Sequence, residues 1–428
     1  MIALSPSSTR IETIEAFAAC RDASALVWAE PRPSGSFDDT AILQNVEDAR
    51  HRFERFAPVL AQLFPIAGWD GRITSPLIRL ADDNSASPLW AKCDHALPIA
   101  GSVKARGGIH EVLKYVEAIA GAHGIGPDDP QFVQRLLDPA AKSWMATHHL
   151  LVGSTGNLGY GVGVAARAFG LAVEVHMSSD AKTWKKERLR SFGVNVVEHD
   201  GDFTEAVAEA RRSAANRPNC HFVDDENSRD LLTGYAVAAR ELADQLEDVG
   251  VCPAPDAPLV VYVPCGVGGA AGGIAIGLKA IFGMSVRVVI VEPLASPCMM
   301  AARLNGDQAV PVYNFGRDNR TIADGLAVPC ASQLVLDVAA HCLDTAVAIS
   351  DETMTRWARQ MWTQAGLRLE PSAAAGFAAR EPLRSVHPEI LRNATELVWT
   401  TGGQLMPDAE FHALIGREIN PTNLLALS

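Results

Sequence analysis

The order of hydrophobic and polar positions changes along the chain. From about residue 146 onward, short runs of β-branched and other apolar residues alternate with longer amphipathic stretches. Short apolar runs are typical of buried strands, and apolar residues at helical spacing are typical of amphipathic helices. The pattern predicts strands at residues 150–152, 171–177, 194–197, 222–223, 258–263 and 286–291, and helices at residues 180–192, 202–216 and 231–249.

This alternation of strands and helices predicts an α/β fold with mostly parallel sheets. The nearly pure apolar strands indicate that helices cover both faces of a sheet. The length of 428 residues fits two domains, one of them split in sequence. We expect a large domain from residues 1–145 and 233–428, with a helical extension at about 1–70, and a small domain from residues 146–232.

Composition and charge narrow the class of protein. The chain is 48% hydrophobic and 20% charged, which is typical of a soluble globular protein, and its net charge of -13 argues against a nucleic-acid partner. Its start lacks the features of a signal peptide, and no apolar run reaches the roughly 18 residues of a membrane span. The eight cysteines are scattered without a C-x-x-C pair, so we expect free thiols, a cytoplasmic location and no metal centre.

A lysine stands among small residues in the segment GSVKARGG at residues 101–108. Apolar residues then recur at helical spacing from Ile109 to Ala120, so Lys104 lies at or just before the start of a helix. The positive end of the helix dipole and burial both disfavour a charged amine. We therefore expect a lowered pKa and a neutral amine able to form a Schiff base. A solvated surface lysine is the alternative.

Three further turns follow expected strands, where open parallel sheets bind their ligands. Residues 153–159 (GSTGNLG) offer backbone N–H groups and hydroxyls to an anion such as a carboxylate, and the amide of Asn157 can bond a ring hydroxyl. Residues 264–273 (PCGVGGAAGG) suit a phosphate. Residues 398–403 (VWTTGG) place a hydroxyl where it could face a pyridine nitrogen. Each turn alone also fits an ordinary strand end or a capped helix start.

The glycine-rich turn has a second interpretation. Residues 266–271 fit the dinucleotide fingerprint G-x-G-x-x-A, and Glu292 ends the following strand, where a ribose-binding acid would stand. A nicotinamide-dependent oxidoreductase is therefore an alternative. It leaves Lys104 and the turn at residues 153–159 unexplained, and Pro293 directly follows Glu292.

Taken together, eight blocks in order along the chain resemble the tryptophan-synthase-β-type class of pyridoxal-phosphate enzymes, also called fold type II. They are most similar to the D-serine dehydratase (D-serine ammonia-lyase) family. The blocks are residues 97–108, 152–159, 175–180, 222–229, 263–269, 323–328, 369–373 and 394–403. The resemblance implies two open twisted sheets flanked by helices and an active site in the cleft between the domains. It also implies pyridoxal phosphate as cofactor, conversion of D-serine to pyruvate and ammonia, and a monomer. The net charge and the absence of a long apolar run lead us to expect no nucleic-acid and no membrane partner.

The resemblance also implies roles for individual residues. Lys104 would form the Schiff base with the cofactor and then act as the general base on the Cα proton. The ring hydroxyl would be bound by Asn157 and the pyridine nitrogen by Thr400. The remaining roles are the cofactor phosphate at Gly266, Val267, Gly268 and Gly269, the substrate at Ser154, Thr155, Gly156 and Asp225, and a monovalent cation at Glu292. Ala270 and Ala271 stand where relatives are expected to carry glycine or proline, a change that leaves the phosphate-binding amides intact.

Two alternatives stay open within this class. One is a different reaction, such as dehydration of D-threonine, L-serine or L-threonine, or a β-replacement. The other is a non-catalytic relative that binds amino acids. Asp225 itself has two interpretations, because residues 224–227 either recognise the substrate or cap the following helix.

Overall fold

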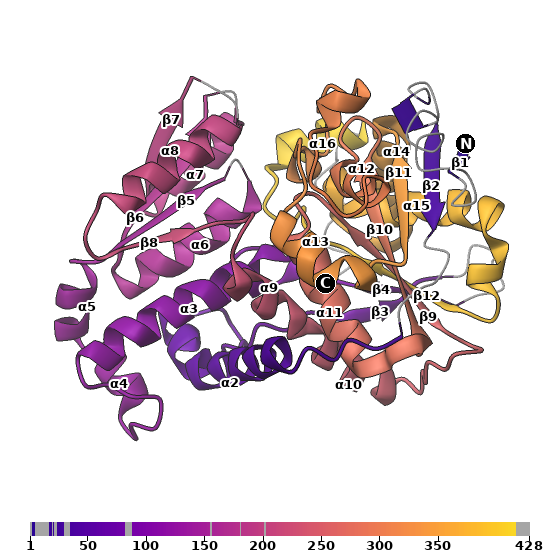
Figure 1. Cartoon of the computed structure of the whole chain (residues 1–428). Helices are drawn as coiled ribbons and strands as arrows, with labels where there is room; N and C mark the ends of the chain where they lie inside the picture. Colours follow the sequence, from indigo (N-terminus) through magenta and orange to yellow (C-terminus); the bar gives the residue numbers. More distant parts are fainter. Residues whose placement is uncertain are drawn as a thin grey trace, which may run out of the picture.

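A computed structural model gives the architecture of the chain and describes residues 2–4, 17–18, 20, 24–29, 35–81, 88–154, 156–179, 181–200 and 203–416. The fold is α/β, as the sequence predicts, and contains an eight-stranded and a four-stranded sheet that lie side by side (Figure 1). Within this described part of the chain, no helix is both long and apolar enough to cross a membrane. All eight cysteines are free thiols.

The large sheet has the strand order β1-β2-β11-β10-β9-β12-β4-β3. Its strands are β1 (Ile2–Leu4), β2 (Ala25–Ala29), β3 (Leu77–Arg79), β4 (Leu89–Lys92), β9 (Leu259–Pro264), β10 (Val286–Pro293), β11 (Thr345–Ile349) and β12 (Thr395–Trp399). Neighbouring strands run parallel except in the pairs β3–β4 and β2–β11. The expected strands at residues 258–263 and 286–291 correspond to β9 and β10 and are confirmed.

Helices cover both faces of this sheet because successive side chains of a strand point to opposite sides. In β9, Val261 and Val263 pack in the same core as helix α11 (Gly269–Phe282). Val260 and Tyr262 pack in a second core, with helix α15 (Pro371–Val386). This arrangement explains why β9 is buried along its whole length and reads as a continuous apolar run.

The small sheet is entirely parallel and has the order β7-β6-β5-β8. Its elements are β5 (His149–Gly153), α6 (Asn157–Phe169), β6 (Ala172–Ser178), α7 (Thr183–Ser191), β7 (Asn195–His199), α8 (Phe203–Ala215) and β8 (Cys220–Val223). All of them lie within residues 146–232, although the domain boundaries themselves stay a prediction. Gly170 and Gly193 follow α6 and α7 with left-handed backbones, which is the conformation that favours glycine after a helix.

Helices of different lengths lie below and between the two sheets in Figure 1. They are α2 (Thr40–Leu63), α3 (Lys104–Ala122), α9 (Arg229–Ala236) and α10 (Ala238–Asp248). The remaining helices named in Figure 1 are α4 (Phe132–Leu137), α5 (Pro139–Met145), α12 (Cys298–Leu304), α13 (Gln333–Ala339), α14 (Asp351–Ala365) and α16 (Asp408–Ile415).

Two expectations about helices need correction. The helical extension at residues 1–70 is right for α2 and wrong for Ile2–Leu4 and Ala25–Ala29, which form strands β1 and β2. The five residues of β2 are all apolar and buried, so they lack the polar face of a surface helix and instead pair with β1 and β11. The single helix expected at residues 231–249 is two helices, α9 and α10, which meet at Val237.

Candidate functional site

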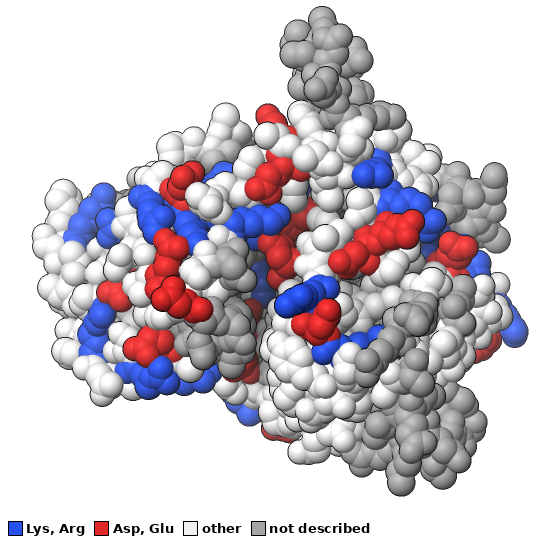
Figure 2. Space-filling model, turned by 90° about the horizontal axis from the view of Figure 1, so that it is seen from above, with Lys and Arg blue, Asp and Glu red and all other residues white. Residues whose placement is uncertain are grey.

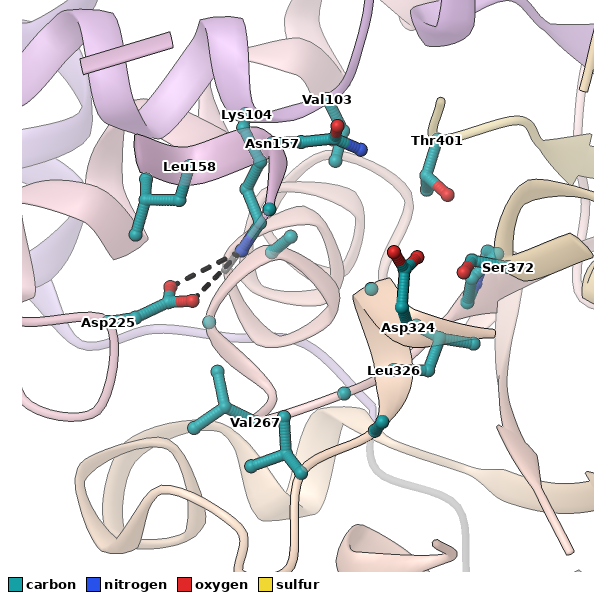
Figure 3. A pocket seen from close by; sticks show the side chains of 18 of the residues that line it. Val103, Lys104, Asn157, Leu158, Asp225, Val267, Asp324, Leu326, Ser372 and Thr401 are labelled. Carbon is teal, nitrogen blue, oxygen red and sulfur yellow. Dashed lines mark hydrogen bonds and ion pairs between the residues drawn. The ribbon is translucent and has the colours of Figure 1, made fainter. Parts of the chain in front are cut away.

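One pocket lies where the turns after β5 and β9 meet the start of α3 and the segment after β12. Its wall consists of residues 103–104, 154, 156–158, 225, 264, 266–271, 324–328, 370, 372 and 401. Segments from both sheets therefore contribute to one pocket (Figure 3). The sequence indicated these turns because the carboxyl ends of parallel strands lie at one edge of a sheet.

Lys104 is the first residue of α3, and its side chain points into the pocket. The Nζ atom lies 3.3 Å and 3.2 Å from the two carboxylate oxygens of Asp225, as the dashed lines in Figure 3 mark. The expected lowering of the pKa of Lys104 is wrong for this arrangement. Burial is the largest single influence and acts to lower the pKa, but Asp225 and Tyr235 together outweigh burial and raise the pKa well above its ordinary value. The structure thus pairs a charged Lys104 with the residue expected to contact the substrate.

The glycine-rich turn connects β9 to α11, which begins at Gly269. Gly268 has a φ of +112°, and a Cβ atom there would lie 2.4 Å from Cε of Met299. A Cβ atom on Gly266 would lie 3.1 Å from the carbonyl oxygen of Gly325. The glycines therefore permit a tight backbone turn beside the first N–H groups of α11, which have no partner inside the helix. This is the arrangement that binds phosphate groups.

The turn after β5 contributes Ser154, Gly156 and Asn157 to the pocket, whereas Thr155 lies outside the described residues. Ser154 accepts a hydrogen bond from the backbone N–H of Gly156 through Oγ at 3.2 Å. Asn157 begins α6 and donates its Nδ2 hydrogen to Oε1 of Glu370 at 2.9 Å. Because this bond identifies the amide nitrogen, it fixes which way the side chain of Asn157 is turned.

The two threonines after β12 have different surroundings. The hydroxyl of Thr400 is fully buried, donates to the carbonyl of Lys92 at 2.9 Å, and lies 2.8 Å from Nδ1 of His95. Thr400 does not form part of the described pocket wall, whereas Thr401 does and points toward Asp324 in Figure 3. This placement does not support Thr400 as the partner of a bound ring. It favours the neighbouring Thr401, whose side chain reaches the pocket.

Sequence reasoning missed an acidic part of the pocket wall formed by Asp324 and Glu370. Burial, together with the charge of Asp324, raises the pKa of Glu370 to about 7. Burial also acts on Asp324, but its ion pair with Lys185 outweighs burial and lowers its pKa. One sequence signal pointed to the position of Glu370. Proline is favoured at the first position of a helix, so Pro371 places Glu370 directly before the start of a helix, here α15.

Glu292 lies away from the pocket wall and is completely buried. Its carboxylate accepts hydrogen bonds from the backbone N–H groups of Met299 and Met300 at 2.7 Å and 2.9 Å, at the start of α12. Burial raises the pKa of Glu292 to about 8, although these two bonds act in the opposite direction. A carboxylate held in this way does not stand where a ribose-binding acid is required, so the geometry counts against the dinucleotide alternative. Its role as a cation ligand stays a prediction.

The residues around the pocket fit pyridoxal phosphate. The glycine turn and the start of α11 suit its phosphate, the amine of Lys104 is the group that can react with its aldehyde, and the amide of Asn157 can reach a ring hydroxyl. The hydroxyl of Ser372 also lines the pocket and has no hydrogen-bond partner, although the residue is only 2% exposed. Such an unpartnered buried hydroxyl is expected where a bound polar group completes the site.

The chain is similar in sequence to pyridoxal-phosphate enzymes over most of its length. The family described as "Pyridoxal-phosphate dependent enzyme" matches residues 69–400. A "Probable D-serine dehydratase" from Pseudomonas paraeruginosa is 45% identical over 396 residues and covers 87% of this chain and 88% of that protein. A protein of the same name from Cupriavidus pinatubonensis is 44% identical over 419 residues, with 94% of each chain covered.

Solved structures share the fold at low sequence identity. Diaminopropionate ammonia lyase from Escherichia coli, in complex with D-serine, has a TM-score of 0.74 at 20% identity and covers 91% of this chain and 96% of that chain. Threonine deaminase isoform 2 from Solanum lycopersicum has a TM-score of 0.65 at 19% identity, with 90% of each chain covered. The family match spans most of this chain, and the two relatives cover 87% and 94% of this chain. The protein therefore belongs to the family of pyridoxal-phosphate-dependent enzymes.

Proposed function

We propose that the protein converts D-serine to pyruvate and ammonia. The observation that carries this proposal is the meeting of Lys104, Asn157 and the glycine-rich turn in one pocket. The relatives named "Probable D-serine dehydratase" support the choice of substrate, since the pocket residues alone do not distinguish the two mirror forms of serine. D-serine loses its β-hydroxyl group and its Cα proton as one water molecule, which leaves aminoacrylate. Hydrolysis of aminoacrylate consumes one water molecule, so the net products are pyruvate and ammonia.

Pyridoxal phosphate supplies, when bound, an electron sink that makes the Cα proton of an amino acid acidic. The backbone N–H groups at residues 266–269 would hold its phosphate, Asn157 its ring hydroxyl and Thr401 its pyridine nitrogen. A neutral threonine, unlike a carboxylate, would not hold a proton on that nitrogen, which favours elimination of the β-substituent over reactions that need a longer-lived carbanion. Thr401 here replaces the Thr400 of the sequence prediction.

Lys104 must lose a proton before its amine can act as a nucleophile or a base. Asp225 is the carboxylate in contact with that amine, at 3.2 Å, and the strength of this ion pair controls when the proton is lost. Glu370 keeps the amide of Asn157 turned so that its second N–H hydrogen is available to the pocket. Ser154, Gly156 and, by prediction from sequence, Thr155 would receive the carboxylate of the substrate.

The test is the release of pyruvate by purified, cofactor-loaded protein that is given D-serine or L-serine in separate reactions. Release from D-serine that is lost in Lys104→Ala is the expected result. Release from L-serine alone would keep the chemistry and overturn the substrate. No pyruvate from either serine, with cofactor bound, would favour another fold type II reaction, such as a β-replacement. We also propose that the protein is a monomer, which gel filtration tests, and that it is located in the cytoplasm, which cell fractionation tests. A monovalent cation at Glu292 is tested by measuring activity with different salts.

A further inference from the structure

The described wall of the pocket has an excess of acidic side chains. Asp225, Asp324 and Glu370 contribute three carboxyl groups, and Lys104 is the one basic side chain of that wall. Lys104 is already paired with Asp225 and has its own part in the proposed reaction. An amino acid brings a further carboxylate, which gains from a positive charge close to its binding turn.

Lys185 of helix α7 supplies such a charge from immediately behind the wall. Its Nζ atom lies 3.9 Å from the position that a Cβ atom would take on Gly156, in the turn expected to receive the substrate carboxylate. The same Nζ atom donates to Oδ2 of Asp324, which also lines the pocket, at 2.6 Å. The side chain is only 10% exposed, and an ammonium group has three hydrogens to donate. A bond to Asp324 therefore leaves it able to donate to a second acceptor.

This contact also crosses between the two parts of the molecule. Lys185 lies in α7, within the segment of residues 149–223 that forms the four-stranded sheet and its helices, here called the small-sheet part. Asp324 begins a short 3-10 turn (Asp324–Leu326) among the segments around the eight-stranded sheet, here called the large-sheet part. Figure 2 shows basic and acidic side chains gathered on both sides of the hollow between these parts. A lysine that bonds Asp324 and lies against Gly156 touches both sides of that hollow.

We propose that Lys185 is a specificity-determining residue that binds the substrate carboxylate together with the turn at residues 154–156. Asp324 pairs with the same ammonium group, and this contact balances the negative charge of Asp324 without being required for binding of the carboxylate. The inference rests on the proposed function, because it assigns the carboxylate of D-serine to that turn.

A purely structural role for Lys185 makes a different prediction. Helix α7 has two other contacts with the large-sheet part: Lys182 pairs with Glu410 at 3.2 Å, and Arg188 donates to the carbonyl of Leu405 at 3.0 Å. If Lys185 only tied α7 in place, then loss of either lysine would have a similar effect. Lys182→Met is therefore the matched control, since it removes an exposed ion pair of the same helix and leaves the turn unchanged.

The experiment measures binding of D-serine and of D-serine amide, which replaces the charged carboxylate with a neutral amide. Binding is followed by the change in absorbance of the bound cofactor. Lys185→Met should weaken D-serine binding about tenfold or more, the range for a lost charged hydrogen bond, and leave the affinities for the amide and for the cofactor unchanged. Lys182→Met should leave all three affinities unchanged, and Lys185→Arg should restore most of the D-serine affinity. Equal losses for D-serine and its amide, or unchanged D-serine binding in Lys185→Met, would overturn the inference.

Asp324→Asn gives a second and independent test. It breaks the ion pair but keeps the ammonium group and removes a negative charge from the pocket, so D-serine binding should stay the same or become tighter. Weaker binding of D-serine in Asp324→Asn would indicate that the ion pair acts by holding α7 in place, and it would overturn the inference. The reaction is judged separately by pyruvate release from the unaltered protein. If Lys185→Met selectively loses D-serine binding but the parent protein releases no pyruvate, the proposed reaction is wrong and the role of Lys185 stands. If Lys185→Met releases pyruvate normally with the KM of the parent protein, the reaction stands and the role of Lys185 is wrong.

Discussion

The Nζ atom of Lys104 and the carboxylate of Asp225 form an ion pair at 3.2 Å inside the pocket. Lys104 begins α3 and Asp225 follows β8, so the pair joins two segments that lie 121 residues apart in the chain. The positive end of α3 and burial both act against the charge on Lys104, and Asp225 acts together with Tyr235 to outweigh burial. The protonation of the amine therefore depends on the carboxylate that contacts it.

Asp225→Asn should lower the pKa of Lys104, because burial is then no longer opposed by a negative charge. Cofactor-stripped protein should consequently attach pyridoxal phosphate faster at neutral pH, and the rise of this rate with pH should move to lower pH. The rate is read from the visible absorbance of the attached cofactor over a pH series. Asp224→Asn is the control, since Asp224 pairs with Arg211 instead. The same pH profile for Asp225→Asn and the parent protein would contradict the prediction.

Glu370→Gln should change how stability depends on pH. The pKa of Glu370 is raised from 4.5 to about 7, so the folded protein binds more protons than the unfolded chain between these values, and the contribution of Glu370 to stability falls as pH rises through this window. A glutamine keeps the acceptor for Asn157 and removes this loss. The free energy of unfolding of the variant, relative to that of the parent protein, should therefore rise by up to about 3 kcal/mol from pH 5 to pH 8. Urea unfolding at both pH values measures the difference, and a gain that is independent of pH would refute it.

Thr401→Ala and Thr400→Ala should affect different properties. Thr401 lines the pocket, so its loss should weaken cofactor binding by about three- to tenfold, the usual range for one hydrogen bond. Thr400 is bonded to Lys92 and His95, so its loss should cost about 1–3 kcal/mol of stability and leave the cofactor affinity unchanged. Cofactor titration and urea unfolding of both variants separate the two effects. The opposite assignment would restore Thr400 as the ring partner.

Gly268→Ala should weaken binding of the cofactor phosphate. The backbone at Gly268 has a φ of +112°, which is strained for any residue with a Cβ atom at a cost of about 1–3 kcal/mol, whereas the nearby Cε of Met299 ends a flexible side chain that can move away. Affinity for pyridoxal phosphate should fall, whereas affinity for pyridoxal, which lacks the phosphate, should change little. Gly121→Ala in α3 is the control, because nothing lies within 4 Å of its added Cβ atom and a helical alanine is favourable. Equal losses for both ligands would show that the turn does not act through the phosphate.

Local features of the fold and the pocket could be predicted from sequence. Strand β9 and the glycine turn after it were found because apolar runs and glycines carry their signal within a few residues. Strand β2 was missed because its five apolar residues pair with β11, which lies more than 300 residues later in the chain. A short apolar run without a local partner does not reveal whether it is a strand or a helix.

The errors within the pocket have the same physical origin. The prediction for the pKa of Lys104 rests on its own helix and on burial, but the pKa is raised by Asp225 and Tyr235, which lie 121 or more residues away in the chain. The contact between Lys185 and Asp324 spans 139 residues and leaves no trace in any local pattern. The choice between Thr400 and Thr401 depends on the direction of two adjacent side chains, which point to opposite sides of an extended segment. Lys104, Asn157 and the glycine turn were accessible because each stands in a recognisable strand-to-helix or helix-start context.

The position of β12 in the large sheet has a consequence for synthesis of the protein. Strand β12 lies between β9 and β4, and it pairs residues 396–399 with residues 89–92. The hairpin of β3 and β4 therefore has no place in the sheet until the ribosome has made almost the whole chain. The small sheet, in contrast, comes from the continuous segment of residues 149–223 and can fold while the rest is still being translated. A nascent chain that stops before residue 395 would expose the adjoining edges of β9 and β4, which makes such truncated products targets for chaperones and proteases.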